Sequence, residues 1–206
     1  MAESGINIVT TIVVADKSLL VSYDDAKTVV EDRAGKIDFR RKYLSGYLIE
    51  DWKEQLEEKK EPSPIDLAKL KEVLIKDFQE MHKAGVRLMP GTDVAVLLIY
   101  PGYSLHDELQ LLVKYVSLTP MQAIISATRY PAEFFGMQKT LGTIEKGKSQ
   151  TLSCSMRIRL TTSVTQIASP PLYLMEGIYR RKQGKRCWQT LKPRKLPNFY
   201  ATSKNV

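Results

Sequence analysis

The sequence predicts an α/β fold, in which short strands buried on both faces alternate with amphipathic helices. Residues 6–14 are almost all apolar or β-branched, as in the buried strands of parallel sheets. Residues 63–85 follow a helical period, and residues 86–89 form a second short apolar run before Pro90 and Gly91. Strand, helix, strand and helix in this order is typical of an α/β barrel or a doubly wound sheet.

The helix between the two strands has clear start and stop signals. Ser63 suits an N-cap, Pro64 suits the first helical position, and Asp66 completes a capping-box pattern. Gly85 is expected to close the helix. Apolar residues recur at helical spacing on one face: Leu67, Leu70, Val73, Leu74, Phe78 and Met81.

The remaining segments predict further helices. Residues 15–62 are polar and charged with scattered aromatics, and residues 50–60 predict a solvated helical stretch. The aromatic spacing at residues 43–52 suits an amphipathic helix that covers a cleft. Further helices are expected at about residues 105–116 and about residues 120–128, the second capped by the preceding threonine.

The net charge of +8 lies entirely in the last part of the chain. Residues 149–206 contain 11 Lys or Arg against one acid, Glu176, whereas the other 148 residues hold 20 basic and 22 acidic side chains. The body is therefore near neutral. The 206 residues suffice for one ordinary domain but fall short of the ~250 of a typical α/β barrel.

Cysteine content and hydropathy exclude several protein classes. Cys154 and Cys187 are too few and too far apart for a disulfide framework or a zinc knuckle. No apolar run approaches the ~18–20 residues of a membrane span, so no membrane partner is expected. No signal peptide is evident, but a fragment would have lost one, so cytoplasmic is only the default compartment.

The most informative motif is residues 84–93, which read as a helix end, a short buried strand and a tight turn presenting Asp93. A carboxylate at the carboxyl end of a strand lies where α/β barrels place their chemistry. The alternative is a carboxylate that only caps the turn. Gly-Thr-Asp alone does not decide between the two.

Motifs downstream of Asp93 favour the first interpretation. In order they are Gly-Tyr-Ser-Leu-His-Asp-Glu-Leu (102–109), Leu-Thr-Pro-Met-Gln-Ala (118–123), Ala-Thr (127–128), Pro-Ala-Glu-Phe-Phe-Gly (131–136) and Leu-Gly-Thr-Ile-Glu-Lys-Gly-Lys (141–148). In this order and spacing, the chain resembles the C-terminal third of a metal-dependent amidohydrolase of the imidazolonepropionase and prolidase-like branch. The resemblance covers roughly residues 1–148.

This resemblance implies a fold and a reaction. Residues 1–141 would form part of a TIM (β/α)8 barrel, namely its last two β/α units, and residues 142–148 would begin a composite β-sandwich. The family binds zinc or another divalent metal through a His-x-His pair, a carboxylated lysine, further histidines and an aspartate on the eighth strand. The metal activates water to hydrolyse carbon–nitrogen bonds in small-molecule amides, cyclic amides or dipeptide-like amides.

Asp93 matches the eighth-strand aspartate, so the resemblance makes it a metal ligand and the catalytic proton acceptor. Strands one to six of the barrel have no counterpart in the sequence. A zinc site takes about three or four protein ligands, and one carboxylate cannot hold it. We therefore expect a truncated fragment that has no hydrolase activity alone and binds catalytic metal weakly or not at all.

The two histidines do not supply the missing ligands. His82 is expected in the last turn of the helix before Gly85, where an imidazole suits the helix C-terminus. His106 opens the helix after the eighth strand, on the rim that carries function in the family. It is either a substrate-binding group or a polar residue at a helix start.

The resemblance ends abruptly after Lys148. Family members continue with Ala-Asp-Leu-Val-Val-Leu-Asp, whereas this chain reads Ser-Gln-Thr-Leu-Ser-Cys-Ser. Back-translation in a shifted frame, with permitted wobble bases, restores the family sequence, an agreement that is hard to obtain by chance. We therefore expect residues 149–206 to be a frame-shifted, disordered and poorly defined basic tail.

Two other functions stay open. A non-enzymatic protein could bind nucleic acid through this tail, because residues 180–186 are rich in Arg and Lys and Trp188 lies nearby for stacking. The chain could instead be one half of a split amidohydrolase, with a complementary chain carrying the first six strands.

Overall fold

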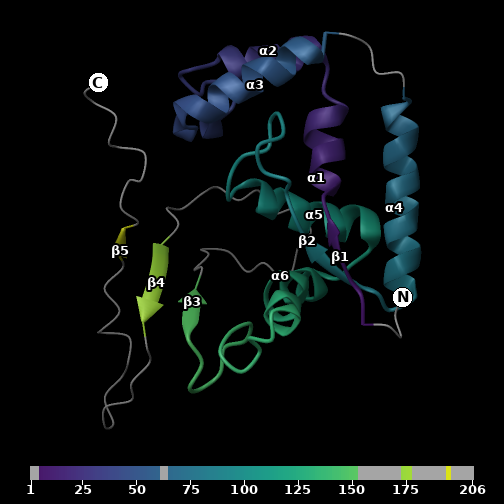
Figure 1. Ribbon diagram of the computed structural model, residues 1–206, viewed down its shortest axis with the longest axis vertical. Coiled ribbons are helices and arrows are strands. Elements are labelled where there is room, and N and C mark those ends of the chain that lie inside the picture. The colour runs from purple at the N-terminus through teal and green to yellow at the C-terminus, as the bar shows by residue number, and fades with distance from the viewer. Residues whose placement is uncertain (1–4, 61–64, 153–172, 178–193, 196–206) are drawn as a thin grey trace. The chain divides into compact units, whose positions relative to one another are not determined.

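The computed structural model describes residues 5–60, 65–152, 173–177 and 194–195 (Figure 1). The chain forms two compact units, Met1–Thr119 and Pro120–Val206. The fold is mixed α/β, mostly helical, with a small parallel sheet. Within the described residues, no helix is both long and apolar enough to cross a membrane.

The first unit is built on two parallel strands joined by a helical crossover. Strand β1 (Asn7–Thr10) pairs with β2 (Arg87–Pro90), so that Asn7 lies opposite Arg87 and Thr10 opposite Pro90. Parallel strands need a long connection, and helix α4 (Leu67–Lys83) lies within it. The predicted order of strand, helix and strand is confirmed.

Strand β1 is shorter than predicted. Residues 12–14 are not extended but form helix α1 (Ile12–Val14), which continues as the π-helical segment η1 (Ala15–Leu19). The last bond of this pair is the 2.7 Å bond from the Gly91 N–H to the Thr10 carbonyl. The prediction of a strand through Val14 is therefore wrong.

The core of this unit lies around the sheet and helix α5 (Ser104–Val116). Helix α5 begins one residue before its predicted start and ends where predicted. Its buried side chains pack with those of β2, α1 and the loop after β2: Ile12, Val13, Val86, Leu88, Ile99, Leu111, Leu112, Val116 and Leu118.

Helix α4 differs from the prediction at its start. Asp66 is itself the N-cap, its carboxylate accepting the Lys69 N–H at 3.0 Å, so the predicted capping box is wrong. Ser63 and Pro64 lie outside the described residues. The helix ends as predicted, because Gly85 has a φ of 79° and the Val86 N–H reaches back to the Met81 carbonyl.

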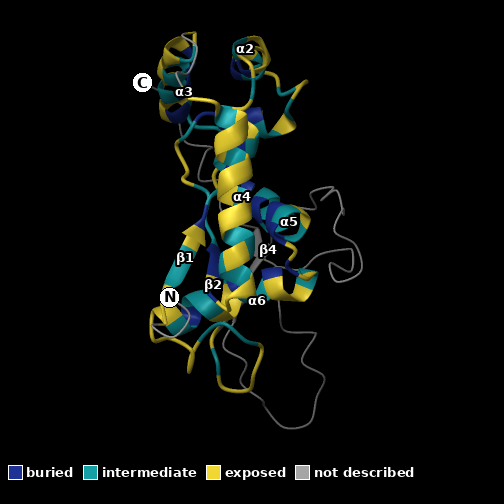
Figure 2. Cartoon of the chain, turned by 90° about the vertical axis from the view of Figure 1, so that its right-hand side faces the viewer, coloured by how far each residue is buried: buried dark blue, intermediate teal, exposed yellow. Residues whose placement is uncertain are grey.

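Only the C-terminal half of the predicted α4 face packs on the core. Phe78 and Met81 contact the cluster around the sheet, whereas Leu70, Val73 and Leu74 are exposed. No residue of α4 is fully buried, and Figure 2 shows the helix largely in the exposed colour. The predicted helix and its apolar face are present, but the N-terminal half of that face is exposed.

The segment between β1 and α4 folds on its own second cluster. It contains helix α2 (Tyr23–Glu31), the 3-10 helix η2 (Phe39–Tyr43) and helix α3 (Gly46–Glu58). The buried side chains of this cluster come from α2, α3 and the loop after β2: Ala26, Val30, Leu48, Trp52, Leu56, Leu97, Leu98 and Tyr100.

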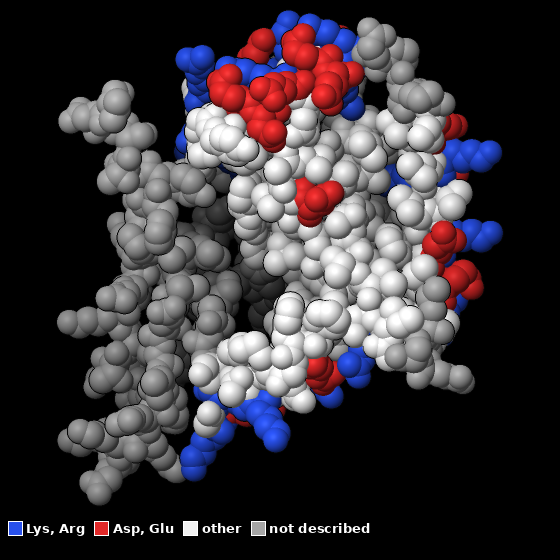
Figure 3. Space-filling model, in the orientation of Figure 1, with Lys and Arg blue, Asp and Glu red and all other residues white. Residues whose placement is uncertain are grey.

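Helix α3 confirms the predicted amphipathic helix but not a fully solvated one. Trp52 and Leu56 are buried, so the prediction for residues 50–60 holds only for the outer face. The Ser45 hydroxyl caps the helix by accepting the Leu48 N–H. Charged side chains gather on the surface over α2 and α3 (Figure 3).

In the part of the second unit that the structure describes there are helix α6 (Pro120–Phe134) and three short strands. Helix α6 begins where predicted but extends past residue 128 and includes Pro131. It ends at Phe134, and Gly136 two residues later has a φ of 68°, which lets the Met137 N–H reach back to the Ala132 carbonyl at 2.7 Å.

Strands β3 (Gln150–Leu152), β4 (Tyr173–Gly177) and β5 (Arg194–Lys195) pair antiparallel in that order. Most of the predicted basic tail lies outside the described residues, and so does the cluster proposed to bind nucleic acid. The frame-shift hypothesis stays a prediction.

Candidate functional site

Asp93 lies just beyond the carboxyl end of β2, after the turn made by Gly91 and Thr92. A Cβ on Gly91 would lie 2.5 Å from Val9 Cγ1 and 3.1 Å from the Thr10 carbonyl oxygen. Glycine therefore permits the close approach of this turn to β1. The turn presents a carboxylate at the end of the strand, as the motif predicts.

The Asp93 carboxylate is unengaged. The side chain is exposed, and within the described residues it forms no hydrogen bond or ion pair, to His106 or to any other group. This result argues against a carboxylate that caps its own turn. Both oxygens remain available to a ligand outside the described part of the chain.

The loop that carries Asp93 has an unusual backbone. Asp93, Ala95 and Leu98 have φ values of 50°, 101° and 65°, in the region that favours glycine. Each such residue costs on the order of 1–3 kcal/mol and persists only where its surroundings hold it. Strained backbone of this kind is concentrated at functional sites in proteins.

At the carboxyl end of the neighbouring strand β1 lies the buried carboxylate of Glu108, which belongs to α5. Its Oε1 accepts hydrogen bonds from Thr10 Oγ1 at 2.7 Å and from the Ile12 N–H at 3.1 Å. Its Oε2 accepts the Val13 N–H at 2.7 Å. Glu108 therefore satisfies the first N–H groups of helix α1, which explains why the chain turns there.

Burial raises the pKa of Glu108 above its ordinary value, against the opposing effect of its three hydrogen bonds. Sequence reasoning missed this residue, although Glu108 lies in one of the motifs that carry the family resemblance. The sequence did contain a signal for it, because Glu108 shares a helical face with the apolar Leu112. An acidic side chain on the buried face of a helix needs a hydrogen-bonding partner in the core.

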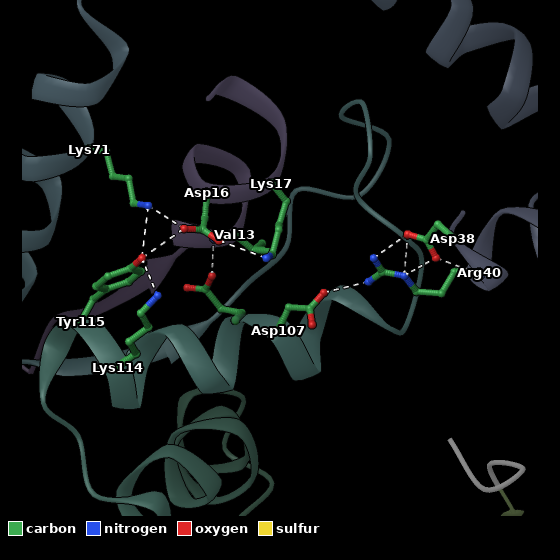
Figure 4. A network of polar contacts seen from close by, with 10 residues as sticks. Val13, Asp16, Lys17, Asp38, Arg40, Lys71, Asp107, Lys114 and Tyr115 are labelled. Atoms are coloured by element: carbon green, nitrogen blue, oxygen red, sulfur yellow. Dashed lines mark hydrogen bonds and ion pairs between the residues drawn. The ribbon is translucent and has the colours of Figure 1, made fainter. Parts of the chain in front are cut away.

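A second polar network joins η1 to α4 and α5 (Figure 4). Asp16 Oδ1 accepts hydrogen bonds from Lys71 Nζ at 2.5 Å and from Tyr115 Oη at 3.3 Å, and Lys17 lies 3.3 Å from the other oxygen. Partial burial would raise the pKa of Asp16, but the two lysines outweigh it and hold that pKa below its usual value. The network fixes the helix that follows β1.

A third network holds the start of α5 against η2. The Arg40 guanidinium forms ion pairs with Asp38 at 2.7 Å and with Asp107 at 3.0 Å (Figure 4). It also lies over the rings of Tyr100 and Tyr103, at 4.3 and 4.7 Å from their centroids. All of these groups are engaged with one another, so we read the network as structural.

The two histidines lie at opposite ends of their helices. His106 is half-buried in the first turn of α5, and its ring meets Tyr103 edge-on with centroids 6.2 Å apart. His82 lies in the last turn of α4, as predicted, and its carbonyl accepts the Gly85 N–H. The structure does not test a substrate-binding role for His106.

The described residues do not fit a complete metal site. Among them, no three His, Cys, Asp or Glu side chains gather closely enough to hold a metal ion. A zinc site takes about three or four protein ligands, whereas at the carboxyl end of β2 the described residues offer one free carboxylate, that of Asp93. No step through a metal can therefore be assigned to these residues alone.

Comparison with known proteins identifies relatives. The sequence model of the amidohydrolase family matches residues 27–152. A crystal structure of an amidohydrolase superposes with a TM-score of 0.50 and 22% sequence identity, over 89% of this chain and 36% of that chain. At this identity the likeness concerns the fold, and the chain spans about a third of that protein's length. No curated protein matches the chain.

Proposed function

The chain belongs to the amidohydrolase family, and from this premise we propose that it supplies the last two β/α units of a hydrolase barrel. The branch we favour is that of imidazolonepropionase and the prolidase-like enzymes, because the motifs after Asp93 follow it in order. The arrangement of β1, α4, β2 and α5, with parallel strands, supports this proposal. Whole barrels of this type have eight such units.

The observation that carries the proposal is the free carboxylate of Asp93. It follows the carboxyl end of a parallel strand, which is where barrel enzymes place catalytic groups. It is exposed, and its loop is strained. We propose that Asp93 is a metal ligand and proton acceptor in hydrolysis of a carbon–nitrogen bond in a small-molecule amide or cyclic amide. His106 is proposed to bind substrate.

The metal and the remaining ligands are expected to come from outside the described residues. When bound, a divalent metal lowers the pKa of coordinated water toward ~7 and polarises a carbonyl. Among the residues that the structure describes, we assign only the Asp93 carboxylate to such a site. We therefore expect the chain alone to have no hydrolase activity.

Zinc titration of the full chain by calorimetry tests this assignment. The wild-type chain is expected to bind zinc weakly, and Asp93→Asn is expected to weaken binding further because one anionic ligand is lost. Asp24→Asn is the matched control, since Asp24 is an exposed acid on α2 that makes no side-chain hydrogen bond within the described residues. Tight stoichiometric binding that persists in Asp93→Asn would overturn the proposal.

A specific observation favours the split enzyme as a second candidate. Within the described residues, the parallel sheet has only β1 and β2, so each strand lacks a neighbour on one side. Val9 in β1 is 57% exposed and Val73 in α4 is 49% exposed. A complementary chain carrying the first six strands would pair these edges and cover these side chains.

The split enzyme is tested by co-expression with any neighbouring open reading frame that encodes a His-x-His motif. Co-purification and metal-dependent amide hydrolysis, lost in Asp93→Asn, would support it. Failure of two such chains to associate would exclude that pairing.

A further inference from the structure

The side-chain amide of Gln55 in α3 binds the backbone of the strained loop after β2. The Gln55 Nε2 donates to the Ala95 carbonyl at 2.8 Å, and the Gln55 Oε1 accepts the Leu97 N–H at 2.7 Å. One planar amide thus binds a carbonyl and an N–H two residues apart. This is the pairing that a neighbouring strand would provide.

The Gln55 amide has a fixed orientation. Its second N–H donates to Asp51 Oδ2 at 2.9 Å, one turn earlier on the same helix. The oxygen therefore faces the Leu97 N–H, and the nitrogen faces the two acceptors. Three of the four hydrogen-bonding positions of this amide are therefore in use, both N–H donors included.

The helix that carries Gln55 is firmly anchored. Trp52 and Leu56 flank Gln55 in α3, and both are buried in the cluster that also contains Leu97 and Leu98. Helix α3 therefore contacts the loop in two ways: apolar side chains pack against its second half, and Gln55 forms hydrogen bonds with its middle.

The hydrogen bonds fall where the backbone is most strained. Ala95 has a φ of 101°, and its carbonyl accepts the Gln55 bond. Asp93 precedes it by two residues, with a φ of 50° and a free side chain. A residue in this region returns to negative φ when its surroundings stop holding it. Loss of the Gln55 bonds should therefore change the direction in which Asp93 points.

We propose that Gln55 is a positioning residue for Asp93, and that its amide holds residues 93–98 in the strained conformation that presents the Asp93 carboxylate. The importance of this position for catalysis rests on the proposed function, but the hold on the loop does not. Gln55 belongs to the segment between β1 and α4; it lies within residues 27–152, which the family model matches, but outside the sequence motifs at residues 84–148.

NMR of the full chain tests the proposal, with amide shifts and HN–Hα couplings of Asp93, Ala95 and Leu98 as the readout. Gln55→Met keeps the length and bulk of the side chain but removes its three bonds. It is expected to shift these couplings and to speed hydrogen exchange of the Leu97 amide about fivefold, as for the loss of one neutral hydrogen bond. Glu54→Met on the exposed side of α3 is the matched control.

Gln55→Glu separates this role from general stabilisation. At pH 7 the introduced carboxylate repels the Ala95 carbonyl and Asp51, the charged group bonded to this amide. Below an ordinary glutamate pKa of about 4.3 it regains one O–H donor, which can bind the Ala95 carbonyl while its other oxygen accepts the Leu97 N–H; the bond to Asp51 is not restored. The loop couplings are therefore expected to differ from wild type at pH 7 and to return on acidification, measured against wild type at each pH.

Wild-type couplings in Gln55→Met, or no recovery of Gln55→Glu at low pH, would overturn the proposal. Neither readout involves a metal. If Asp93 fails to bind zinc, the proposed function falls while the hold of Gln55 on the loop is still judged by NMR. Conversely, unchanged couplings in the Gln55 variants would exclude the positioning role of Gln55 without affecting the zinc titration that tests Asp93.

Discussion

Replacement of Glu108 by leucine tests the role of this buried carboxylate most severely. Leucine fills a similar volume but accepts no hydrogen bond, so the N–H groups of Ile12 and Val13 lose their partner. Each buried N–H left unsatisfied costs about 1–3 kcal/mol, which gives about 4 kcal/mol for the pair. The leucine variant no longer has to bury a carboxylate, and this offsets part of the cost. We therefore expect a net loss of about 3 kcal/mol in the free energy of unfolding.

Glu108→Gln is expected to cost less. Its carbonyl oxygen can accept the Val13 N–H while its NH2 donates to Thr10 Oγ1, so only the Ile12 N–H loses its acceptor. The expected loss is about 1–2 kcal/mol. Urea unfolding at pH 7 measures all variants, with exposed Glu58→Gln as the control at about zero. A Glu108→Leu loss below about 1 kcal/mol, or a reversed order of Leu and Gln, would refute the reasoning.

Three further predictions concern pH and the backbone. Because the folded pKa of Glu108 is raised, the stability it contributes is present below its unfolded pKa of about 4.3 and is lost as pH rises through the folded pKa. Urea unfolding from pH 4 to 7 gives the free energy of unfolding of the wild type and of Glu108→Gln at each pH. The wild-type value minus the variant's value should fall as pH rises, and a rising difference would contradict the prediction. Ala95→Gly should stabilise the chain by about 1 kcal/mol, since glycine adopts a φ of 101° without strain, and a lower melting temperature would contradict this. Gly142→Ala should destabilise the chain by about 2 kcal/mol, because residue 142 has a φ of 91° and the new Cβ would lie 2.7 Å from Ala132 Cβ. Gly46→Ala is the control, since a Cβ at residue 46 would meet no atom within 4 Å. Equal melting temperatures for the two glycine variants would contradict that assignment.

Local sequence signals predicted the parts of the fold that depend on local chemistry. The β-branched run at the start, the periodic helix and Gly85 predicted two strands and the helix between them, and the structure confirms them as a parallel pair. Gly91 and Asp93 predicted the turn at the end of β2. In each case the determining residues lie within a few positions of the feature they control.

The features that the sequence did not reveal depend on distant partners. Strand β1 stops at Thr10 because Glu108, 98 residues later, takes the N–H groups that follow. The helical period of α4 showed which side chains share a face, but not that Val73 would lack a neighbour. Gln55 carries no motif, and its contact with residues 95–97 spans about forty positions. Hydrophobic patterns and secondary-structure propensities depend on neighbouring residues, so they do not predict contacts between residues this far apart in the sequence.

Paramagnetic broadening by Mn²⁺ would test most directly whether Asp93 is a metal ligand. Sub-stoichiometric Mn²⁺ added to the full chain should broaden the amide signals of residues 91–95 before those of other acidic segments. Asp93→Asn should abolish that selectivity, while Asp24→Asn should leave it intact. Broadening that is equally strong at residues 91–95 in Asp93→Asn, or that never selects them in wild type, would contradict the assignment of Asp93 to a metal-binding pocket.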